Sequence, residues 1–449
     1  MLSAGIPARS VRAKEKESGR DQMETEKRVL GALAALCLGA AALRAQEAPS
    51  PSPAQEQGRP TQAELLKRIE QLDESYAAEL EELRAEIEAL EEEAAAARAR
   101  AQTPSLQSAS VFNPGLTVFG NFLARVDDAA AYVDDDPGAE RADDRFSLRE
   151  VELDLRAPID PWADGVLIAT FEAEVPGEYE ASIEEGYVTL KKLPFLDSAP
   201  AGLKVKAGRF RPSLGRFNTI HLHDLPQITY PRALRTFLGS EGFLADGLSG
   251  QFFLPSPSER DVLDATVQVL DGGNIAVAAD QDPSDIATVG RVKWFRDLAP
   301  GRDLELGLSS WHSSGSDELW SVDATYRWKP FVAGEWKSFL LGFEGFQADL
   351  DDPLAASPSG WDLWSQYQLS RNLYVGARYD WTEELADASL ESRTAGVFLT
   401  YYTTEFLRFR LGYERTSSDV AELDGLESLF LELNFIFGSH PAEPYWVNR

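Results

Sequence analysis

Residues 320–329, WSVDATYRWK, alternate strictly between apolar and polar side chains. Successive side chains of an extended strand point to opposite faces. One face therefore carries Trp320, Val322, Ala324, Tyr326 and Trp328. The other face carries Ser321, Asp323, Thr325, Arg327 and Lys329. Tryptophan at both ends of the apolar face, with small side chains between, suits a layer of lipid better than the dry core of a sandwich.

The spacing of the two tryptophans supports this interpretation. Trp320 and Trp328 are separated by about 26 Å along a strand, and a tilt near 40° reduces the distance to about 20 Å. Outer-membrane barrels have an apolar band about 25 Å tall with an aromatic girdle at each edge. The alternation then predicts that Asp323, Arg327 and Lys329 face a water-filled lumen. A soluble β-sandwich predicts the same alternation, but not the paired aromatic ends.

Similar segments fill the chain from about residue 110 to its end. We predict strands at 116–127, 146–157, 165–175, 179–193, 203–211, 247–254, 262–271, 286–296, 303–312, 319–329, 335–348, 361–370, 372–382, 393–403, 406–416 and 427–437. Short connections such as SRN and TTE alternate with longer acidic ones such as DLDDPLAASPSG. An even number of strands with two unlike rims is typical of a transmembrane barrel. The expected fold is therefore all-β, a 16-stranded antiparallel transmembrane β-barrel over 110–449.

A different pattern precedes the barrel. Residues 23–45 have basic residues, an apolar stretch and small residues at the end, as in a secretory signal peptide, and residues 1–22 then form a mis-called extension. The only cysteine, Cys37, lies in this signal after Leu36, which argues against a lipid anchor. Residues 46–60 are a Pro/Ser-rich linker. Residues 61–102 carry apolar residues at alternating steps of three and four, which predicts an α-helical coiled coil, with a single surface-bound helix as the alternative.

Charge excludes one class of partner. The chain has 43 Lys and Arg against 74 Asp and Glu, a net charge of -31. Such a chain repels polyanions, so we expect no nucleic-acid partner.

The longest connection, 208–247, departs from this acidic trend. We expect it to be ordered, because loops of this length in compact domains are usually functional. Folded into the lumen, its arginines would line a constriction and contact anions. The alternative is that they pair with carboxylates of facing strands and only brace the loop. The candidate anion contacts are Lys204, Lys206, Arg209, Arg211, Arg216, Arg232 and Arg235.

The segment KVKAGRFRPSLG, which follows IEEGYVTLKKLP, resembles the phosphate-selective porin O/P family of outer-membrane channels. Gly208, Phe210 and Pro212, with Gly215 after them, match the family segment that opens the constriction loop. The resemblance covers about 110–437. It implies a sixteen-stranded homotrimeric diffusion channel with a phosphate site. The acidic composition and the residues after Phe437 depart from the family pattern.

Two histidine-containing segments offer other chemistry. In HLHD, His221, His223 and Asp224 are candidate metal ligands, although two histidines without a third fixed ligand also fit a hydrogen-bonded loop brace. His312, among serines, is a candidate base for a hydrolase. We expect no enzyme activity, no cofactor and no bound metal.

The sequence as a whole predicts a porin of the bacterial outer membrane, with its helix in the periplasm. Its partners would be outer-membrane lipids, small hydrophilic solutes or anions such as phosphate, and copies of itself through the coiled coil and the barrel. The alternative is a structural protein, in which the barrel is an anchor and the coiled coil extends towards the cell wall.

Overall fold

The computed structural model describes Lys67, residues 115–438 and Val447, apart from residues 136, 140, 174–178, 194, 197, 273–274, 279–284, 316, 331–335 and 351–356. The predicted extension, signal peptide, linker and coiled coil lie outside the described residues, except for Lys67. Among the described residues, no helix combines the length and the apolar character that a membrane crossing requires.

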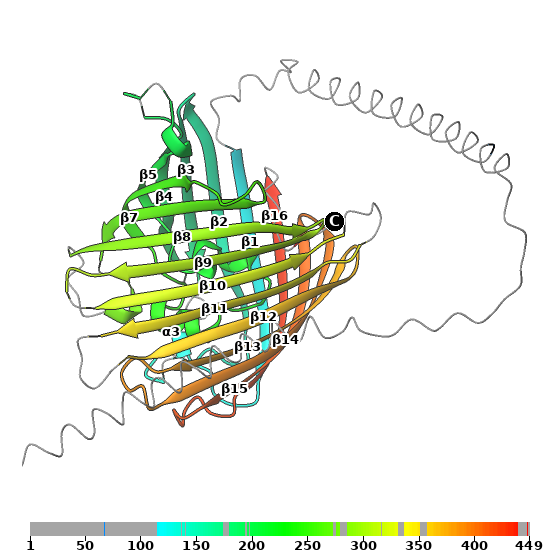
Figure 1. Ribbon diagram of the computed structural model, residues 1–449. Helices are drawn as coiled ribbons and strands as arrows, with labels where there is room; N and C mark the ends of the chain where they lie inside the picture. Colours follow the sequence, from blue (N-terminus) through cyan, green and yellow to red (C-terminus); the bar gives the residue numbers. More distant parts are fainter. Residues whose placement is uncertain are drawn as a thin grey trace, which may run out of the picture. The chain divides into compact units, whose positions relative to one another are not determined.

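Sixteen antiparallel strands form a closed barrel in which each strand pairs with its sequence neighbours and β1 pairs with β16 (Figure 1). The strands are β1 (Gly115–Asp127), β2 (Phe146–Asp160), β3 (Ala163–Glu172), β4 (Glu180–Leu190), β5 (Lys204–Phe210), β6 (Ala245–Leu254), β7 (Asp261–Asp271), β8 (Ile286–Ala299), β9 (Arg302–His312), β10 (Glu318–Trp328), β11 (Phe339–Asp349), β12 (Ser359–Ser370), β13 (Leu373–Glu383), β14 (Glu391–Thr404), β15 (Leu407–Ser418) and β16 (Glu427–Gly438). The predicted barrel is thus confirmed.

Strand ends differ from the prediction by a few residues. The largest difference is at β11, which begins at Phe339 where the sequence pattern predicts residue 335. Trp328 of β10 pairs with Phe339, and Pro330, which has no backbone N–H to donate, follows soon after. The ladder between these two strands therefore cannot extend further towards the turn.

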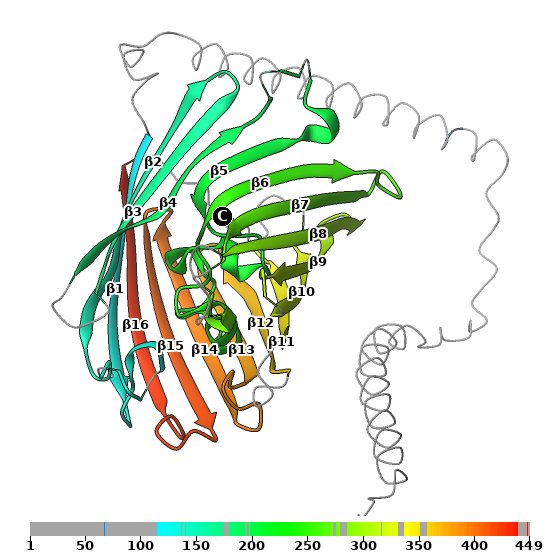
Figure 2. The ribbon, with the colours of Figure 1, turned by 90° about the vertical axis from the view of Figure 1, so that its left-hand side faces the viewer.

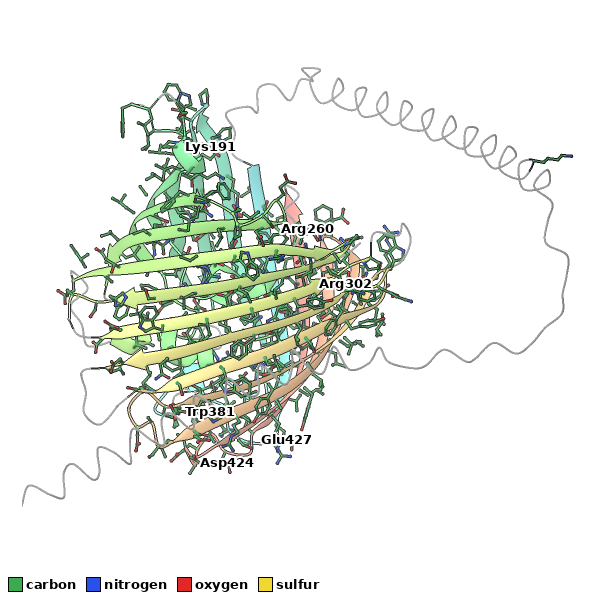
Figure 3. All side chains as sticks on the ribbon, in the orientation of Figure 1. Lys191, Arg260, Arg302, Trp381, Asp424 and Glu427 are labelled. Carbon is green, nitrogen blue, oxygen red and sulfur yellow. The ribbon has the colours of Figure 1, made fainter. Side chains whose placement is uncertain are left out.

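The two rims differ, as the loop lengths predict. Lys191, Arg260 and Arg302 lie at one rim, and Trp381, Asp424 and Glu427 lie at the other (Figure 3). The first rim has tight turns such as 255–260, but it also has the longer connections 191–203 and 329–338. The second rim holds the acidic loops and the long connection between β5 and β6. The short connections thus lie mostly at the first rim and the long ones mostly at the second, with exceptions.

The alternation in β10 is resolved as predicted. Ser321, Asp323 and Thr325 are buried inside the barrel, whereas Trp320 is 43% and Val322 46% exposed. Val322 is registered beside exposed Leu308 of β9, so the outward apolar side chains of neighbouring strands form one continuous band. In this part of the wall the outward face is apolar, and the inward face of β10 from Ser321 to Thr325 is polar.

The connection between β5 and β6 folds into the barrel. It contains the 3-10 turns η4 (Phe217–Thr219) and η5 (Leu222–Asp224) and the helix α3 (Arg232–Leu238). Figure 2 shows this green segment framed by the strands of the wall. We call residues 208–247 the inner loop.

Candidate channel interior

One side of the inner loop packs tightly against the wall formed by β10–β16 and β1. Phe217 contacts Trp364 of β12, with ring centroids 5.7 Å apart, and Phe237 stacks on Phe346 of β11 at 5.6 Å. All four side chains are almost completely buried. This side therefore has a dry apolar core inside the barrel.

Arginines of the wall hold the same side through the loop backbone. Arg410 is fully buried and donates to the carbonyl oxygens of Gln227, at 2.5 Å, and Leu225, at 2.7 Å. In the same way Arg408 donates to His223 O, Arg378 to Thr229 O and Arg149 to Ile228 O. Carbonyl groups removed from water need such donors, and an arginine supplies several at once.

Glycines allow the closest approaches of loop and wall. Gly215 has φ +70°, donates its N–H to Ser309 Oγ at 2.9 Å, and a Cβ there would overlap Glu344. Glu344 in turn accepts the N–H groups of Arg216 and Phe217. At Gly412 of β15, a Cβ would lie 2.4 Å from Ile228 Cδ1. The seated loop therefore requires residues without side chains at both positions.

The other side of the inner loop faces a cavity of about 610 Å³, between loop residues 211–224 and strands β2 and β4–β9. Its lining is mostly polar. The residues that line it are Arg156, Glu185, Tyr187, Lys206, Arg211, Ser213, Gly215, Arg216, Thr219, Ile220, His221, Asp224, Gln251, Asp264, Thr266, Arg291, Lys293 and Glu305. Six arginine or lysine side chains and one histidine thus meet four carboxylates, in a chain whose overall charge is strongly negative.

Most charges in the cavity are paired. Arg216 contacts Glu305, Lys293 lies 3.3 Å from Asp264, and Arg291 lies 2.7 Å from Asp323 and also donates to Gly215 O. Lys206 differs, because none of the described residues forms an ion pair with it within 4.0 Å. Its ammonium group lies 4.0 Å from the centre of the Tyr187 ring. Lys206 therefore brings to the cavity wall a positive charge without a contacting carboxylate, with Glu185 of the same wall acting on it at longer range.

The predicted anion contacts do not form one group. Lys206, Arg211 and Arg216 line the cavity, although Arg211 is buried and paired with Glu184. Arg209 pairs with Asp246 at 3.5 Å, and Lys204 is exposed at the start of β5. These ion pairs fit the alternative interpretation, in which the arginines brace the loop by pairing with carboxylates.

Two more of these arginines lie on α3. Arg232 and Arg235 contact Asp135 of the β1–β2 loop at 3.0 and 2.5 Å, away from the cavity. Burial alone would raise the pKa of Asp135, but the two guanidinium groups outweigh it and hold the pKa below its usual value. This contact ties the inner loop to an outer one.

The three residues that the sequence predicts to face the lumen from β10 also lie in different surroundings. Asp323 is 3% exposed and pairs with Arg291 on the inner wall. Arg327 pairs with Asp303 at 2.6 Å. Lys329 is exposed just beyond the end of β10.

Sequence reasoning missed Arg156, Arg291 and Lys293 of the cavity wall. Each stands on the polar phase of its strand, so the alternation that placed Asp323 inside could have found them. The arginines that hold the loop, such as Arg378 and Arg410, follow the same rule. Strand alternation in the sequence therefore carries the signal for these wall residues.

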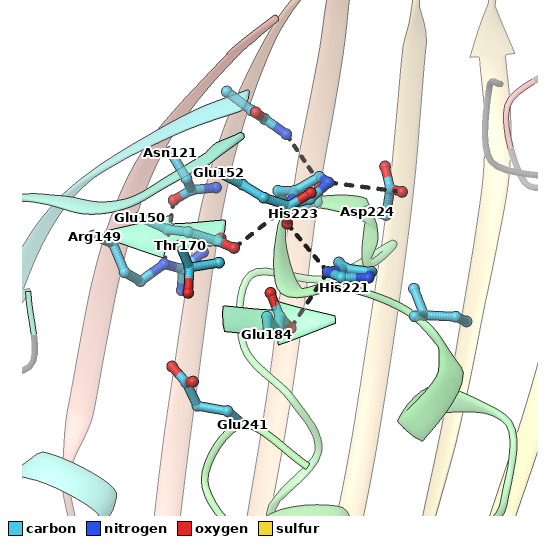
Figure 4. Close-up of polar contacts among 12 residues, drawn as sticks. Asn121, Arg149, Glu150, Glu152, Thr170, Glu184, His221, His223, Asp224 and Glu241 are labelled. Atoms are coloured by element: carbon cyan, nitrogen blue, oxygen red, sulfur yellow. Dashed lines mark hydrogen bonds and ion pairs between the residues drawn. The ribbon is translucent and has the colours of Figure 1, made fainter. Parts of the chain in front are cut away.

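The two loop histidines lie among glutamates of β2 and β4 (Figure 4). His221 Nδ1 is 3.1 Å from Glu152 Oε2 and 3.3 Å from Glu184 Oε1, and His223 Nδ1 is 3.4 Å from Glu152 Oε2. Burial lowers the pKa of His223, but nearby carboxylates, Glu152 first, raise it overall to about 9. Asp224 lies 3.8 Å from His223 Nε2. The sequence identified the histidines but not the glutamates around them.

His312 lies at the outer end of β9. Its Nδ1 is 3.3 Å from Glu318 Oε1, and its ring packs edge-on against Trp320. Ser309 of the same strand points inward to Gly215. Among the described residues, no hydrogen bond joins His312 to a serine.

Comparisons with known proteins address the fold. No family model matches the chain. An uncharacterized protein of Aquifex aeolicus (strain VF5) is 25% identical over 344 residues, 67% of this chain and 70% of that protein. The solved structure of OprB from Pseudomonas putida has a TM-score of 0.50 at 12% identity, over 72% of this chain and 94% of that one.

A second solved structure, the outer-membrane channel DcaP of Acinetobacter baumannii, has a TM-score of 0.49 at 12% identity, over 72% of this chain and 97% of that chain. The likeness to OprB extends over nearly all of that protein and concerns the fold alone. The chain thus shares the barrel fold of outer-membrane porins.

Proposed function

We propose that this chain is an outer-membrane channel for passive diffusion of small hydrophilic solutes, with a preference for anions. The observation that carries the proposal is the polar cavity beside the inner loop, enclosed by a barrel whose outer face is apolar.

The outer surface supports the membrane location. Large apolar side chains are exposed on many strands, including Leu308, Val322 and Leu431, each close to half exposed. Soluble monomers rarely expose contiguous apolar patches beyond a few hundred Å². Lipid is the solvent that makes such a band stable, and a closed barrel leaves no unpaired strand edge in it.

The charges of the cavity support the anion preference. Six basic side chains line it; five of them form ion pairs with carboxylates, and Lys206 is the one for which the described residues show no ion pair. Rings of basic side chains in a narrow passage favour anions, and low-dielectric walls strengthen their field. Arginine also forms paired hydrogen bonds with oxyanions, so phosphate-like solutes fit this wall.

Reversal potentials in a KCl gradient across planar bilayers test the preference. We expect the reversal potential of the purified protein to have the sign that a chloride-selective channel gives. Its magnitude should fall at about 1 M salt, because fixed charges are then screened within about 3 Å. A cation-set potential that is unchanged in Arg216→Gln and Arg291→Gln would refute the anion preference. Absence of any conductance would instead favour the anchor role.

Association is a separate part of the proposal. The resemblance to porins supports a homotrimer, and the heptad-like pattern of residues 61–102 supports self-association through a periplasmic helix. Mass measurement of the detergent-extracted protein, with and without residues 46–102, tests both.

A further inference from the structure

Where β2, β3 and β4 face the inner loop, buried carboxylates surround the two histidines. Glu150 and Glu152 of β2 and His223 are 5%, 1% and 2% exposed. His223 Nδ1 lies 3.7 Å from Glu150 Oε1 and 3.4 Å from Glu152 Oε2. Glu184 and His221 continue the group on the other side of Glu152, as Figure 4 shows. In both triads, Glu150–Glu152–His223 and Glu152–Glu184–His221, the candidate ligand atoms lie within 4.8 Å of one another.

The polar atoms at the centre of this group lack hydrogen bonds. Among the described residues, Glu150 Oε2, Glu152 Oε2 and His223 Nδ1 are all buried and without a hydrogen-bond partner, as is His221 Nδ1. A buried polar group left unsatisfied is costly, and such atoms in a native protein require an explanation. Glu152 Oε2 lies between the two imidazole nitrogens, at 3.1 and 3.4 Å, so a cation bound beside it would accept lone pairs that have no hydrogen-bond donor.

The spacing fits a metal ion. Bonds of about 2.0–2.1 Å to Zn²⁺ in tetrahedral geometry place neighbouring ligand atoms about 3.3–3.4 Å apart. Within the set of Glu150, Glu152 and His223, the distances from His223 Nδ1 to Glu152 Oε2 and Glu150 Oε1 are 3.4 and 3.7 Å, equal to that separation or slightly longer. Imidazole nitrogen mixed with carboxylate oxygen suits Zn²⁺ and its first-row neighbours, whereas Ca²⁺ and Mg²⁺ prefer oxygen alone.

We propose that Glu150, Glu152 and His223 bind a divalent first-row transition-metal ion, for which Zn²⁺ is the best fit. Asp224, beside the other ring nitrogen of His223, is in the position of a carboxylate that orients a ligating histidine. The Phe119 ring stacks on the imidazole at 4.2 Å and limits its rotation. His221 lines the cavity and contacts the same oxygen of Glu152, so the cluster adjoins the cavity.

The bound ion would join the inner loop to β2. His223 belongs to the loop and both glutamates belong to the wall, so one ion links the two. On the opposite face of the same turn, Arg408 and Asn434 already bind the backbone oxygen of His223. The ion would therefore fix this turn between β2 and β15–β16, a role independent of solute passage.

Metal analysis of the untagged, detergent-solubilised full chain tests the proposal. After treatment with EDTA and dialysis, titration calorimetry with Zn²⁺ at pH 7 should show one ion per chain, and Ca²⁺ and Mg²⁺ at equal concentrations should show no binding. We expect Glu152→Gln to weaken Zn²⁺ binding by at least about 100-fold. His312→Ala is the matched control, because it removes another histidine that contacts a glutamate, at the outer rim, and it should bind Zn²⁺ as the wild type does.

A spectroscopic measurement on the unmodified protein keeps the test independent of variant folding. Co²⁺ added to the metal-free wild type should give the visible absorption of a four-coordinate nitrogen and oxygen site, and one equivalent of Zn²⁺ should abolish it. A wild type that takes up no stoichiometric Zn²⁺ or Co²⁺, or Zn²⁺ affinity unchanged in a folded Glu152→Gln variant, would overturn the proposal. The cluster would then be a network of imidazolium and carboxylate ions. Neither result depends on conductance, so failure here leaves the channel proposal untouched.

Discussion

The two sides of the inner loop use the same residue types for opposite purposes. On the side of β10–β16, Arg410 and Arg378 are buried, and their guanidinium groups satisfy loop carbonyls next to an apolar core. On the side of β2 and β4–β9, Arg291 and Lys206 border a cavity. A cation of the wall thus lies buried against the loop or borders the cavity, and Arg291, which lines the cavity and also donates to Gly215 O, does both.

Arg410→Leu should have the largest effect on stability, because it should release the inner loop from the wall on its packed side. It removes the donors of two loop carbonyls and leaves Glu432, 3.1 Å away and 0% exposed, with less compensation. Loss of one partner of a buried ion pair costs about 3–5 kcal/mol. Denaturant titration in detergent should show this loss, together with larger single-channel conductance as the loop leaves its seat.

The control for this change is Arg415→Leu on the same strand. Arg415 is 59% exposed and pairs with Glu427 at the rim, where an ion pair contributes at most about 1 kcal/mol. Equal losses of stability in the two variants would contradict the role assigned to Arg410.

Gly412→Ala should have the next largest effect. The added methyl group would lie 2.4 Å from Ile228, and overpacking of this kind costs about 1–3 kcal/mol. Limited proteolysis should cut the inner loop faster than in the wild type. In Gly250→Ala, where the nearest atom is 4.0 Å from the new carbon, the rate of cleavage should not change.

Asp135→Asn probes the contact between α3 and the β1–β2 loop. Because the pKa of Asp135 is lowered in the folded protein, its stabilisation is present above about pH 4 and is lost as the pH falls through the folded pKa. We expect a cost of about 1 kcal/mol at pH 7. The wild type should lose stability below pH 4 in a step that is smaller in the variant; identical acid profiles would show that this pair does not hold α3.

Lys206→Glu should have the smallest effect on stability. It should change ion selectivity instead, which distinguishes the cavity side of the loop from the packed side. A unit charge in partly hydrated surroundings changes the energy of a passing ion by about 1 kcal/mol, and charge reversal acts on anions and cations in opposite directions, so we expect the ratio of anion to cation permeability to fall by at least about five-fold. Lys191→Glu at the rim, where Lys191 pairs with Asp164 at 2.8 Å, should change the ratio little. Similar changes of the permeability ratio in both variants would mean that selectivity is set at the rim of the barrel.

The barrel could be predicted from the sequence because strand alternation is a local property. All sixteen predicted segments contain a strand, and Trp320 and Asp323 lie on the faces that the alternation assigns.

The interior could be predicted only in part, because its contacts join residues far apart in the chain. His221 and His223 can be recognised in the sequence as candidate ligands because they are histidines. Glu152 and Glu184 come near them only when the strands have closed around the loop. Likewise, Asp135 pairs with Arg232 and Arg235, which lie far along the chain from it. The seat of the inner loop depends on which strands lie opposite it, which local pattern does not encode.

Single-channel recording in planar bilayers tests the central claim most directly, namely that the apolar faces of the strands contact lipid and the polar faces enclose a passage for water. The purified wild-type protein should give discrete conductance steps. A protein that remains soluble and folded without detergent and never conducts would contradict it.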